Sequence, residues 1–264
     1  MMSPFRFTRA IVRRPGANFA EGLTSFNGAA PDYAKAIEQH EDYCKALECC
    51  GLKLVRLEPD LAHPDSTFVE DVAVLTREAA ILTRPGAKSR EREVDGIRKP
   101  LGEYFARIRE IQPPGTLDGG DICEAGRHFF IGVSRRTNEE GAGQLAGFLA
   151  EEGYTSSLVD IRAMKSILHL KSGVACIEDR TLVVMEEMAE REEFRGYEKI
   201  RITPEETYAA NCVRVNQFVL MPKGFPRTAE ALTARGVSLI ALDVSEFRKM
   251  DGGLSCLSLR FSPA

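Results

Sequence analysis

Five segments of similar character recur along the chain at nearly regular intervals. Each is an apolar, strand-like run with a polar or reactive residue at its start or middle: TFVEDVAVL, TLDGGDICEA, ILHLKSGVACI, AANCVRVNQFVLM and GGLSCLSLRF. With Asp71, Asp121, His169, Asn211 and Cys256 as markers, the intervals are 50, 48, 42 and 45 residues. A fixed period of this kind indicates a repeat architecture, so we expect five units to fill the 264 residues.

A second strand-like segment follows each of the first four. These segments are AAILTRPG, HFFIGVSRRTN, TLVVM and FVLMPKGFPRT. The fifth unit has no such follower, because the chain is nearly at its end. The N-terminal segment FTRAIVRRPGA is therefore expected to complete it, which predicts a ring closed by the two chain ends.

Helical patterns lie between the strand pairs. The clearest is PDYAKAIEQHEDYCKALECCGL, with Pro31 where a first-turn proline is tolerated, a stripe at helical spacing, and Gly51 just past its end. RTAEALTARG predicts a shorter helix that ends at Gly236.

Three further helices are expected with less regular signals. Thr137 and Glu140 have the spacing of a capping box, which predicts a helix that ends at Gly153. Thr203 and Glu206 repeat that spacing at the start of TPEETYAANCV. The stretch 90–110 has apolar residues at helical spacing, although Pro100 should break or kink it.

Strands that alternate with helices define an α/β protein. The fivefold interval predicts a five-bladed, pseudo-symmetric α/β-propeller, built as a single catalytic domain over 1–264 from strand–strand–helix–strand units around a central axis. A doubly wound sheet is the competing layout, but no GxGxxG follows an early strand and GxxxxGK[ST] does not occur.

Composition narrows the class of protein. No apolar run reaches the ~18 residues that cross a bilayer, and MMSPFRFTRA lacks a secretory core, so we expect a cytoplasmic protein without a membrane partner. The net charge of −4 disfavours nucleic acid and suits a small cationic substrate. Seven cysteines without CxxC spacing disfavour a disulfide framework and a structural zinc site. Oligomeric state is left open, with a homo-oligomer among the alternatives.

In a ring of such units the strand starts converge on the axis, so the polar residues there should meet. A thiolate is a nucleophile, an imidazole moves protons near neutral pH, and carboxylates can orient the imidazole and hold a guanidinium. Each residue alone also has an ordinary structural explanation: a core cysteine, a hydrogen-bonded core histidine, a turn at LDGGD. The residues expected near one centre are Cys256, His169, Asp118, Asp121, Glu70 and Asp71.

Several motifs together resemble one family over nearly the whole chain. FVEDVAVL, LTRPGAKSR, TLDGGDI, SRRTNEEGAGQ, ILHLKS, FPRTAE and SEFRKMDGGLSCLSLRF resemble the dimethylarginine dimethylaminohydrolases, members of the guanidine-modifying superfamily with the pentein α/β-propeller fold. The resemblance extends from FTRAIVRRPGANFAEGLTS to LSLRF.

This resemblance implies hydrolysis of Nω-methylated L-arginines to L-citrulline and dimethylamine or methylamine, with no metal and no organic cofactor. Cys256, in GGLSC, would attack the guanidinium carbon and form a covalent thiouronium intermediate. His169, in LHLKS, would protonate the leaving amine and then activate water. Asp118, where some members carry Glu, would orient His169.

The same matching implies residues that bind the substrate. Glu70 and Asp71 would face the guanidinium, with Asp65 in the adjoining segment. Arg90 and Arg136 would hold the α-carboxylate; a solvated charge at a helix start is the ordinary alternative for Arg90.

At the α-amino end, Leu23 and Met250 would contribute backbone carbonyls. The glycine-flanked segment 22–28 is predicted to be a mobile lid.

Two other functions fit parts of the pattern. An arginine deiminase-like enzyme would share GGD, the histidine and the late cysteine, and would differ in its substrate. A non-catalytic propeller that acts as a binding module would not need the thiol or the imidazole. The joint presence of Cys256, His169 and the acidic residues favours an enzyme.

Overall fold

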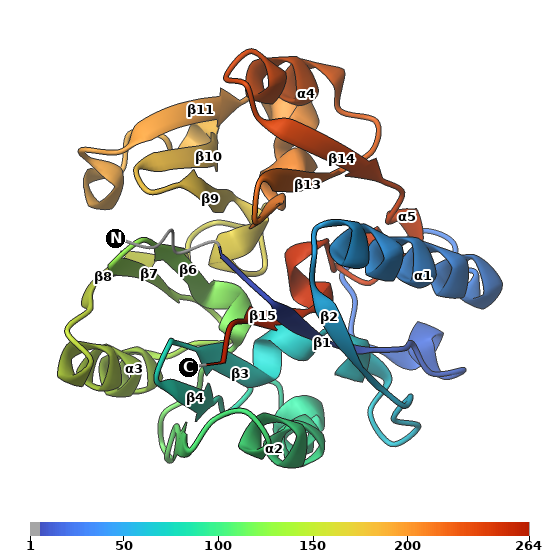
Figure 1. Ribbon diagram of the computed structural model, residues 1–264, viewed down its shortest axis with the longest axis vertical. Helices are drawn as coiled ribbons and strands as arrows, with labels where there is room; N and C mark the ends of the chain where they lie inside the picture. The colour runs from blue at the N-terminus through green and yellow to red at the C-terminus, as the bar shows by residue number, and fades with distance from the viewer. Residues whose placement is uncertain (1–5, 264) are drawn as a thin grey trace.

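Five three-stranded sheets are arranged around a common axis, as Figure 1 shows. The computed structural model describes residues 6–263. Within each sheet the outer partners of the central strand differ: one pairs antiparallel to it and the other parallel. An antiparallel neighbour can follow a tight turn, whereas a parallel one needs a crossover. The sheets are β3-β4-β5, β6-β7-β8, β11-β10-β9, β12-β13-β14 and β15-β1-β2.

The crossovers carry the helices predicted from the sequence in four of the five units. These helices are α1 (Tyr33–Cys49), α2 (Asp95–Gly102), α3 (Glu139–Glu151) and α4 (Pro226–Thr233), and a further short helix, α5 (Ser245–Arg248), lies outside the crossovers. The strands are β1 (Arg9–Arg13), β2 (Lys53–Leu57), β3 (Ala73–Leu75), β4 (Ala79–Leu82), β5 (Arg107–Glu110), β6 (Ile122–Ala125), β7 (His128–Val133), β8 (Thr155–Asp160), β9 (Val174–Glu178), β10 (Thr181–Met185), β11 (Glu198–Ile202), β12 (Val213–Val215), β13 (Phe218–Pro222), β14 (Ser238–Leu242) and β15 (Leu259–Phe261). Between β10 and β11 the crossover consists of the short 3-10 segments η7 (Glu186–Met188) and η8 (Glu192–Phe194).

The two ends of the chain close the ring. Strand β15 pairs antiparallel with β1, with Ala10 opposite Arg260 and Ile11 opposite Leu259. Strand β1 also pairs parallel with β2, across the helix α1. The predicted completion of the fifth unit by the N-terminal strand is therefore confirmed, and the five-unit propeller is the fold of this chain.

The marker residues lie in short turns rather than on strands, which corrects the sequence interpretation. A 3-10 segment precedes the first strand of every sheet, and Cys256 lies in the last of these, ahead of β15. A strand would direct alternate side chains to opposite faces, whereas a turn at the inner end of the strand can place its side chains at the axis. The segments are η3 (Val69–Val72), η5 (Gly119–Asp121), η6 (Leu170–Ser172), η9 (Pro204–Ala210) and η10 (Ser255–Leu257).

Both predicted capping boxes are wrong in detail. Helix α3 begins after Asn138, whose side chain accepts a hydrogen bond from the backbone of Gly141 at 2.8 Å. The residues after Thr203 form η9 instead of an α-helix, and the Glu206 carboxylate accepts from the backbone of Thr228 at 2.8 Å, in the first turn of α4. The acid found three residues after a threonine thus caps a different helix.

The stretch 90–110 divides into three elements. It begins in η4 (Lys88–Val94), continues as α2, and ends in β5. Pro100 lies in the last turn of α2, which ends at Gly102. Ile108, which shares the apolar periodicity, pairs instead with Ala80 in the sheet. A proline near the end of the helix and a partner strand therefore overrode the local pattern.

The hydrophobic core consists of five clusters, each between neighbouring sheets, within residues 6–263. One cluster joins α1 and β1 to β13 and α5, and another joins β4 and α2 to β1 and β15. Burial of these hydrophobic clusters holds the sheets around the axis and leaves the inner turns facing each other.

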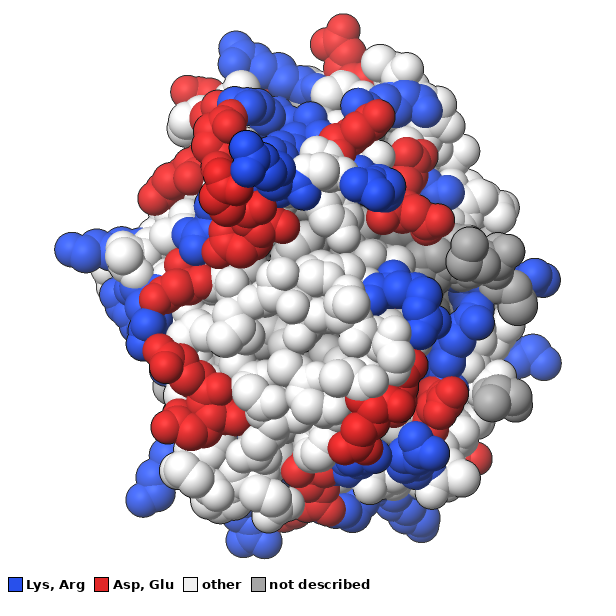
Figure 2. All heavy atoms as spheres, turned by 90° about the vertical axis from the view of Figure 1, so that its left-hand side faces the viewer, with Lys and Arg blue, Asp and Glu red and all other residues white. Residues whose placement is uncertain are grey.

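The charged surface agrees with the low net charge. Figure 2 shows acidic and basic side chains interspersed around a broad central area without charges, on the face that includes the left-hand side of Figure 1. In the part of the chain that the structure describes, no helix has the length and apolarity to cross a bilayer.

Candidate active site

The five inner turns contact each other around the axis. Neighbouring contacts join η3 to η5, η5 to η6, η6 to η9, and η10 back to η3. Between η9 and η10 the link is made by Asn211, which accepts from the Ser255 backbone at 3.1 Å and donates to its hydroxyl at 3.3 Å. The segments that precede the strands therefore meet around the axis, as the sequence predicts.

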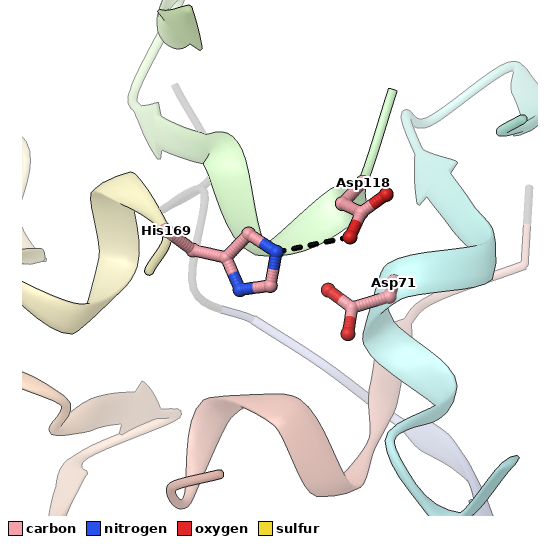
Figure 3. A group of neighbouring side chains, drawn as sticks. All are labelled: Asp71, Asp118 and His169. Atoms are coloured by element: carbon pink, nitrogen blue, oxygen red, sulfur yellow. Dashed lines mark hydrogen bonds and ion pairs between the residues drawn. The ribbon is translucent and has the colours of Figure 1, made fainter. Parts of the chain in front are cut away.

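A histidine and two aspartates from three different units form the centre of this ring. His169 Nε2 lies 3.0 Å from Asp118 Oδ2, and Asp71 directs its carboxylate at the same imidazole, as Figure 3 shows. The other oxygen of Asp118 accepts from the Gly86 backbone at 2.8 Å, which fixes the orientation of the carboxylate. All three side chains are buried.

Charge at this centre favours the protonated imidazole. Burial lowers the pKa of His169, but Asp71, Asp118 and Asp121 outweigh it and raise the pKa to about 9. Burial likewise acts to raise the pKa of Asp71, whereas His169 and Arg90 hold it below its usual value. At neutral pH the imidazolium and the Asp71 carboxylate therefore stabilise each other.

The three groups also have the spacing of metal ligands. One ligand atom from each of Asp71, Asp118 and His169 lies within 4.8 Å of the others. The guanidinium of Arg90 already pairs with Asp71 at 2.7 Å, and the imidazole already pairs with Asp118. Protein cations thus already neutralise the carboxylates that would otherwise bind a metal ion. The expected absence of a metal stays a prediction.

Asp121 positions the turn that carries the histidine. Its Oδ2 accepts from the hydroxyls of Ser134 and Thr137, both at 2.7 Å, and its Oδ1 accepts from the Leu170 backbone at 3.0 Å. Leu170 directly follows His169 in the chain. The carboxylate therefore anchors the turn from which the imidazole extends, and burial raises its pKa to about 6.

The glycine pairs allow neighbouring turns to touch. A Cβ at Gly120 would lie 2.8 Å from Asp71 Oδ1 and 2.9 Å from His169 Nδ1, and a Cβ at Gly253 would lie 2.4 Å from Asn211 Oδ1. The Gly120 backbone donates to Asp71 at 2.9 Å across that gap. Glycine at 120 and 253 therefore permits close packing between the turns of different units.

Cys256 lies in the turn that contacts η3 and is 8% exposed. Burial raises the pKa of its thiol, and the carboxylates of Glu70 and Asp71 raise it further, while Lys171 acts in the opposite direction. The Asp71 carboxylate lies within 4.8 Å of the imidazole, and its turn η3 contacts the turn of Cys256, so its charge acts on both groups. Without a bound cation the sulfur is a neutral thiol.

Glu70 is held by two cations from other units. Its Oε1 lies 2.6 Å from Lys171 Nζ and 3.1 Å from Arg260 Nη2. Its Oε2 is buried and has no hydrogen-bond partner. Sequence reasoning gave neither cation a role, although a charged residue inside the apolar motifs LHLKS and LSLRF was a usable signal.

The two predicted carboxylate-binding arginines differ in their surroundings. Arg90 is buried and donates from Nε and Nη2 to Glu93 and from Nη1 to Asp71. It is therefore a structural cation at the site and not a solvated helix start. Arg136 keeps 17% of its side chain exposed; its Nη1 lies 3.9 Å from Asp118 Oδ2 and has no hydrogen-bond partner. Arg136 is thus the arginine with a free donor, while a carboxylate contact at Arg90 stays a prediction.

The residues expected at the α-amino end come together beside a loop. The Leu23 backbone donates to both oxygens of Asp65 at 3.1 Å. A Cβ at Gly22 would lie 2.4 Å from Asp65 Oδ1 and 3.1 Å from Met250 Cε. The segments of Leu23 and Met250, which were expected at the amino end of the substrate, therefore meet beside Asp65, and their role in binding stays a prediction.

The loop 22–28 is tied to the turn before the nucleophile. Thr24 Oγ1 donates to the Lys249 carbonyl at 2.7 Å, and the Ser25 backbone and hydroxyl donate to Asp251 at 2.6 and 2.9 Å. Leu23 and Phe26 are 40% and 47% exposed. These polar links are exposed to water, so they suit a cover that opens; its motion stays a prediction.

A cavity of about 130 Å³ borders Glu70. Residues of β3, β6, β9, β12 and β15 line it, together with Glu70, Lys171, Arg260 and Ser255. Cys256, His169 and Asp118 are not in its lining. The cavity therefore borders Glu70 and its two cations but not the candidate catalytic groups.

Comparison with known proteins identifies the class and then the family. Residues 63–219 match the family model described as arginine deiminase, the class that this fold and this arrangement of thiol, imidazole and carboxylates define. The chain is 44% identical to N(G),N(G)-dimethylarginine dimethylaminohydrolase of Pseudomonas aeruginosa over 97% of its own length and 100% of the relative. A relative of the same name from Streptomyces coelicolor is 34% identical, over 96% of both chains. The chain belongs to the dimethylarginine dimethylaminohydrolase family.

Solved structures agree with this assignment. A cysteine-to-serine variant of the Pseudomonas aeruginosa enzyme in complex with citrulline superposes with a TM-score of 0.94 at 44% identity and covers 97% of this chain and 100% of that one. The N-terminal domain of ArgZ, covalently bound to a reaction intermediate, superposes with a TM-score of 0.86 at 18% identity, over 97% and 98% of the two chains, and shows the shared fold.

Proposed function

We propose that this protein hydrolyses Nω-methylated L-arginines, such as asymmetric dimethylarginine and monomethylarginine, to L-citrulline and dimethylamine or methylamine. The observation that carries the proposal is the position of Asp71: its carboxylate lies within 4.8 Å of the His169 imidazole, and its turn η3 contacts η10, which carries Cys256. A carboxylate at that point can hold a guanidinium between a nucleophile and a proton donor. The family relatives and the citrulline complex of one of them support the same chemistry.

Binding of the substrate would prepare the nucleophile. Glu70 and Asp71 raise the pKa of Cys256 in the free protein. A guanidinium bound to these carboxylates adds a positive charge next to the sulfur, so it favours loss of the thiol proton. The thiolate is then produced where and when its target is present.

The reaction follows in two covalent steps. In the first, Cys256 Sγ forms a bond to the guanidinium carbon, and the bond from that carbon to the methylated nitrogen breaks as His169 delivers a proton to the departing amine. The product is a thiouronium cation on the cysteine. In the second, neutral His169 takes a proton from water, the hydroxide adds to the carbon, and the C–S bond breaks to give citrulline and a free cysteine.

The remaining residues would orient these groups. Asp118 holds the imidazole at 3.0 Å and would stabilise its protonated form, the role of the third member in such triads. Arg136, with its unpaired Nη1, would bind the α-carboxylate, with Arg90 behind it. Asp65, the Leu23 carbonyl and the Met250 carbonyl would bind the amino end.

The test is formation of citrulline from asymmetric dimethylarginine, monomethylarginine and arginine. We expect turnover of the methylated substrates, and loss of turnover with a retained fold in Cys256→Ser. Substrate should also protect Cys256 from alkylation. Turnover of arginine alone would replace our assignment with an arginine deiminase-like enzyme. Undiminished activity in Cys256→Ser would refute the role of Cys256 as nucleophile, and no turnover of any of the three would leave the binding module.

A further inference from the structure

One buried arginine near the end of the chain contacts both the turn of the nucleophile and the acid expected at the guanidinium. Arg260 Nη1 donates to the carbonyls of Ser255 at 3.2 Å and Ser258 at 2.9 Å, and to the Ser258 hydroxyl at 2.8 Å. Its Nη2 donates to Glu70 Oε1 at 3.1 Å. Only 12% of its side chain is exposed.

The first set of bonds lies on both sides of Cys256. Ser255 precedes the cysteine and Ser258 follows it by two residues, so one nitrogen binds the carbonyls that flank the turn. A three-residue 3-10 turn leaves carbonyl groups without partners of its own, and η10 has no side-chain cap. The Ser258 hydroxyl also contacts Tyr43 Oη in α1 at 2.7 Å. Arg260 therefore connects the nucleophile turn to a fully buried side chain of the first helix.

The second contact places Glu70 relative to that turn. Glu70 is in η3, a different unit of the ring, and Lys171 shares the same oxygen. The planar guanidinium donates from one nitrogen to the turn and from the other to the carboxylate, and the single ammonium of a lysine does not supply that fixed separation. The separation between sulfur and carboxylate is thus set through one rigid group.

We propose that Arg260 is a positioning residue for the proposed reaction: its guanidinium holds the Cys256 turn and the Glu70 carboxylate at the separation that a guanidinium substrate requires for attack. The inference rests on the proposed function, because it states how this chain aligns that nucleophile with that substrate. Arg260 does not touch the reacting atoms; it acts through Glu70 and through the backbone on both sides of the cysteine.

The test compares Arg260→Lys and Arg260→Gln with Arg13→Gln. Arg13 is a matched control: it is also a buried arginine of the same sheet, and it donates to the carbonyls of Glu58 and Gly96. With dimethylarginine we expect kcat to fall by about 10- to 100-fold in both Arg260 variants, the loss typical of a misplaced reacting group. Arg13→Gln should keep its kcat. Arg260→Lys should therefore be slow although it keeps the positive charge.

A double-mutant cycle separates positioning from a general loss of stability. If Arg260 acts through Glu70, Arg260→Gln should cost less kcat in a Glu70→Gln background than in the native protein. Alkylation of Cys256 by iodoacetamide, without substrate, should be faster in Arg260→Gln than in Arg13→Gln, because the turn is released. This second readout does not need turnover.

The outcomes are distinguishable. If the native protein turns over no methylated arginine, the proposed function fails, and an unchanged alkylation rate in Arg260→Gln then overturns the role of Arg260 as well. If the native protein is active, native kcat in Arg260→Gln or full rescue by Arg260→Lys overturns the positioning role alone. Additive effects in the cycle would also overturn it, because a purely structural residue does not couple to Glu70.

Discussion

Replacement of Asp118 by Asn removes one charge from the centre of the ring and has an effect that can be worked out. The pKa of His169 lies at about 9 instead of 6.5, a difference that corresponds to about 3 kcal/mol in favour of the imidazolium. Asp71 contributes to this, and so do Asp118 and Asp121. A buried hydrogen bond between charged partners is worth about 1.5–3 kcal/mol. Loss of the Asp118 charge should therefore lower the pKa of His169 by about 1 to 2 units.

The same change should slow the reaction. An asparagine amide can leave the imidazole in an unproductive tautomer and no longer stabilises its protonated form, so we expect kcat to fall by about 10²- to 10⁴-fold. The alkaline limb of the kcat/KM profile should move to lower pH, because the free protein loses its imidazolium earlier. Asp118→Glu keeps the negative charge, so its kcat should fall less than that of Asp118→Asn.

NMR titration of the imidazoles measures the shift directly. The chain has four histidines, and His169→Gln identifies the signal of interest. Asp160→Asn is a matched control, because Asp160 is exposed and pairs with Arg162 at 2.6 Å. A native His169 that titrates near 6.5, or a pKa that Asp118→Asn leaves in place, would refute the reasoning.

Two further predictions follow from the buried charges. His169 keeps its proton in the folded chain above the pH at which the unfolded chain releases it, so this contribution to stability is complete below pH 6.5. It is lost as pH rises to about 9. Denaturant titrations should show the free energy of unfolding fall by about 3 kcal/mol over that window, and less in His169→Gln; equal slopes would contradict this. Arg136→Gln should raise KM about 10- to 100-fold with a small change in kcat, whereas Arg90→Gln leaves Asp71 and Glu93 without their cation and should cost about 3–5 kcal/mol of stability. Equal unfolding midpoints of the two arginine variants would exclude this division of roles.

The fold was predictable because its repeat is visible in the order of the residues. Apolar runs with a polar entry every 42 to 50 residues indicate five equal units, and the missing strand of the last unit points to the N-terminal segment. The errors were local. The stretch 90–110 kept a helical period although Ile108 pairs in a sheet, and Glu206 had capping spacing although it caps α4. Partners distant in sequence decided both.

The site was predictable in its chemistry and less so in its contacts. Cys256, His169 and the acidic residues were expected to meet, and their turns do contact each other. Sequence reasoning did not find that Asp121 anchors the histidine turn, or that Glu70 is paired with Lys171 and Arg260. Hydrogen bonds between units depend on distances that no single motif contains.

The number of units, the residue types at the start of each and the pairing of the two terminal strands could all be predicted from the order of the residues. Each of these follows from a pattern along the chain, since periodicity and side-chain type are local properties. The division of the charges depends on the folded chain instead: Arg90 satisfies buried acids while Arg136 keeps a free donor. That division depends on which turn lies against which, and the packing between neighbouring sheets sets it.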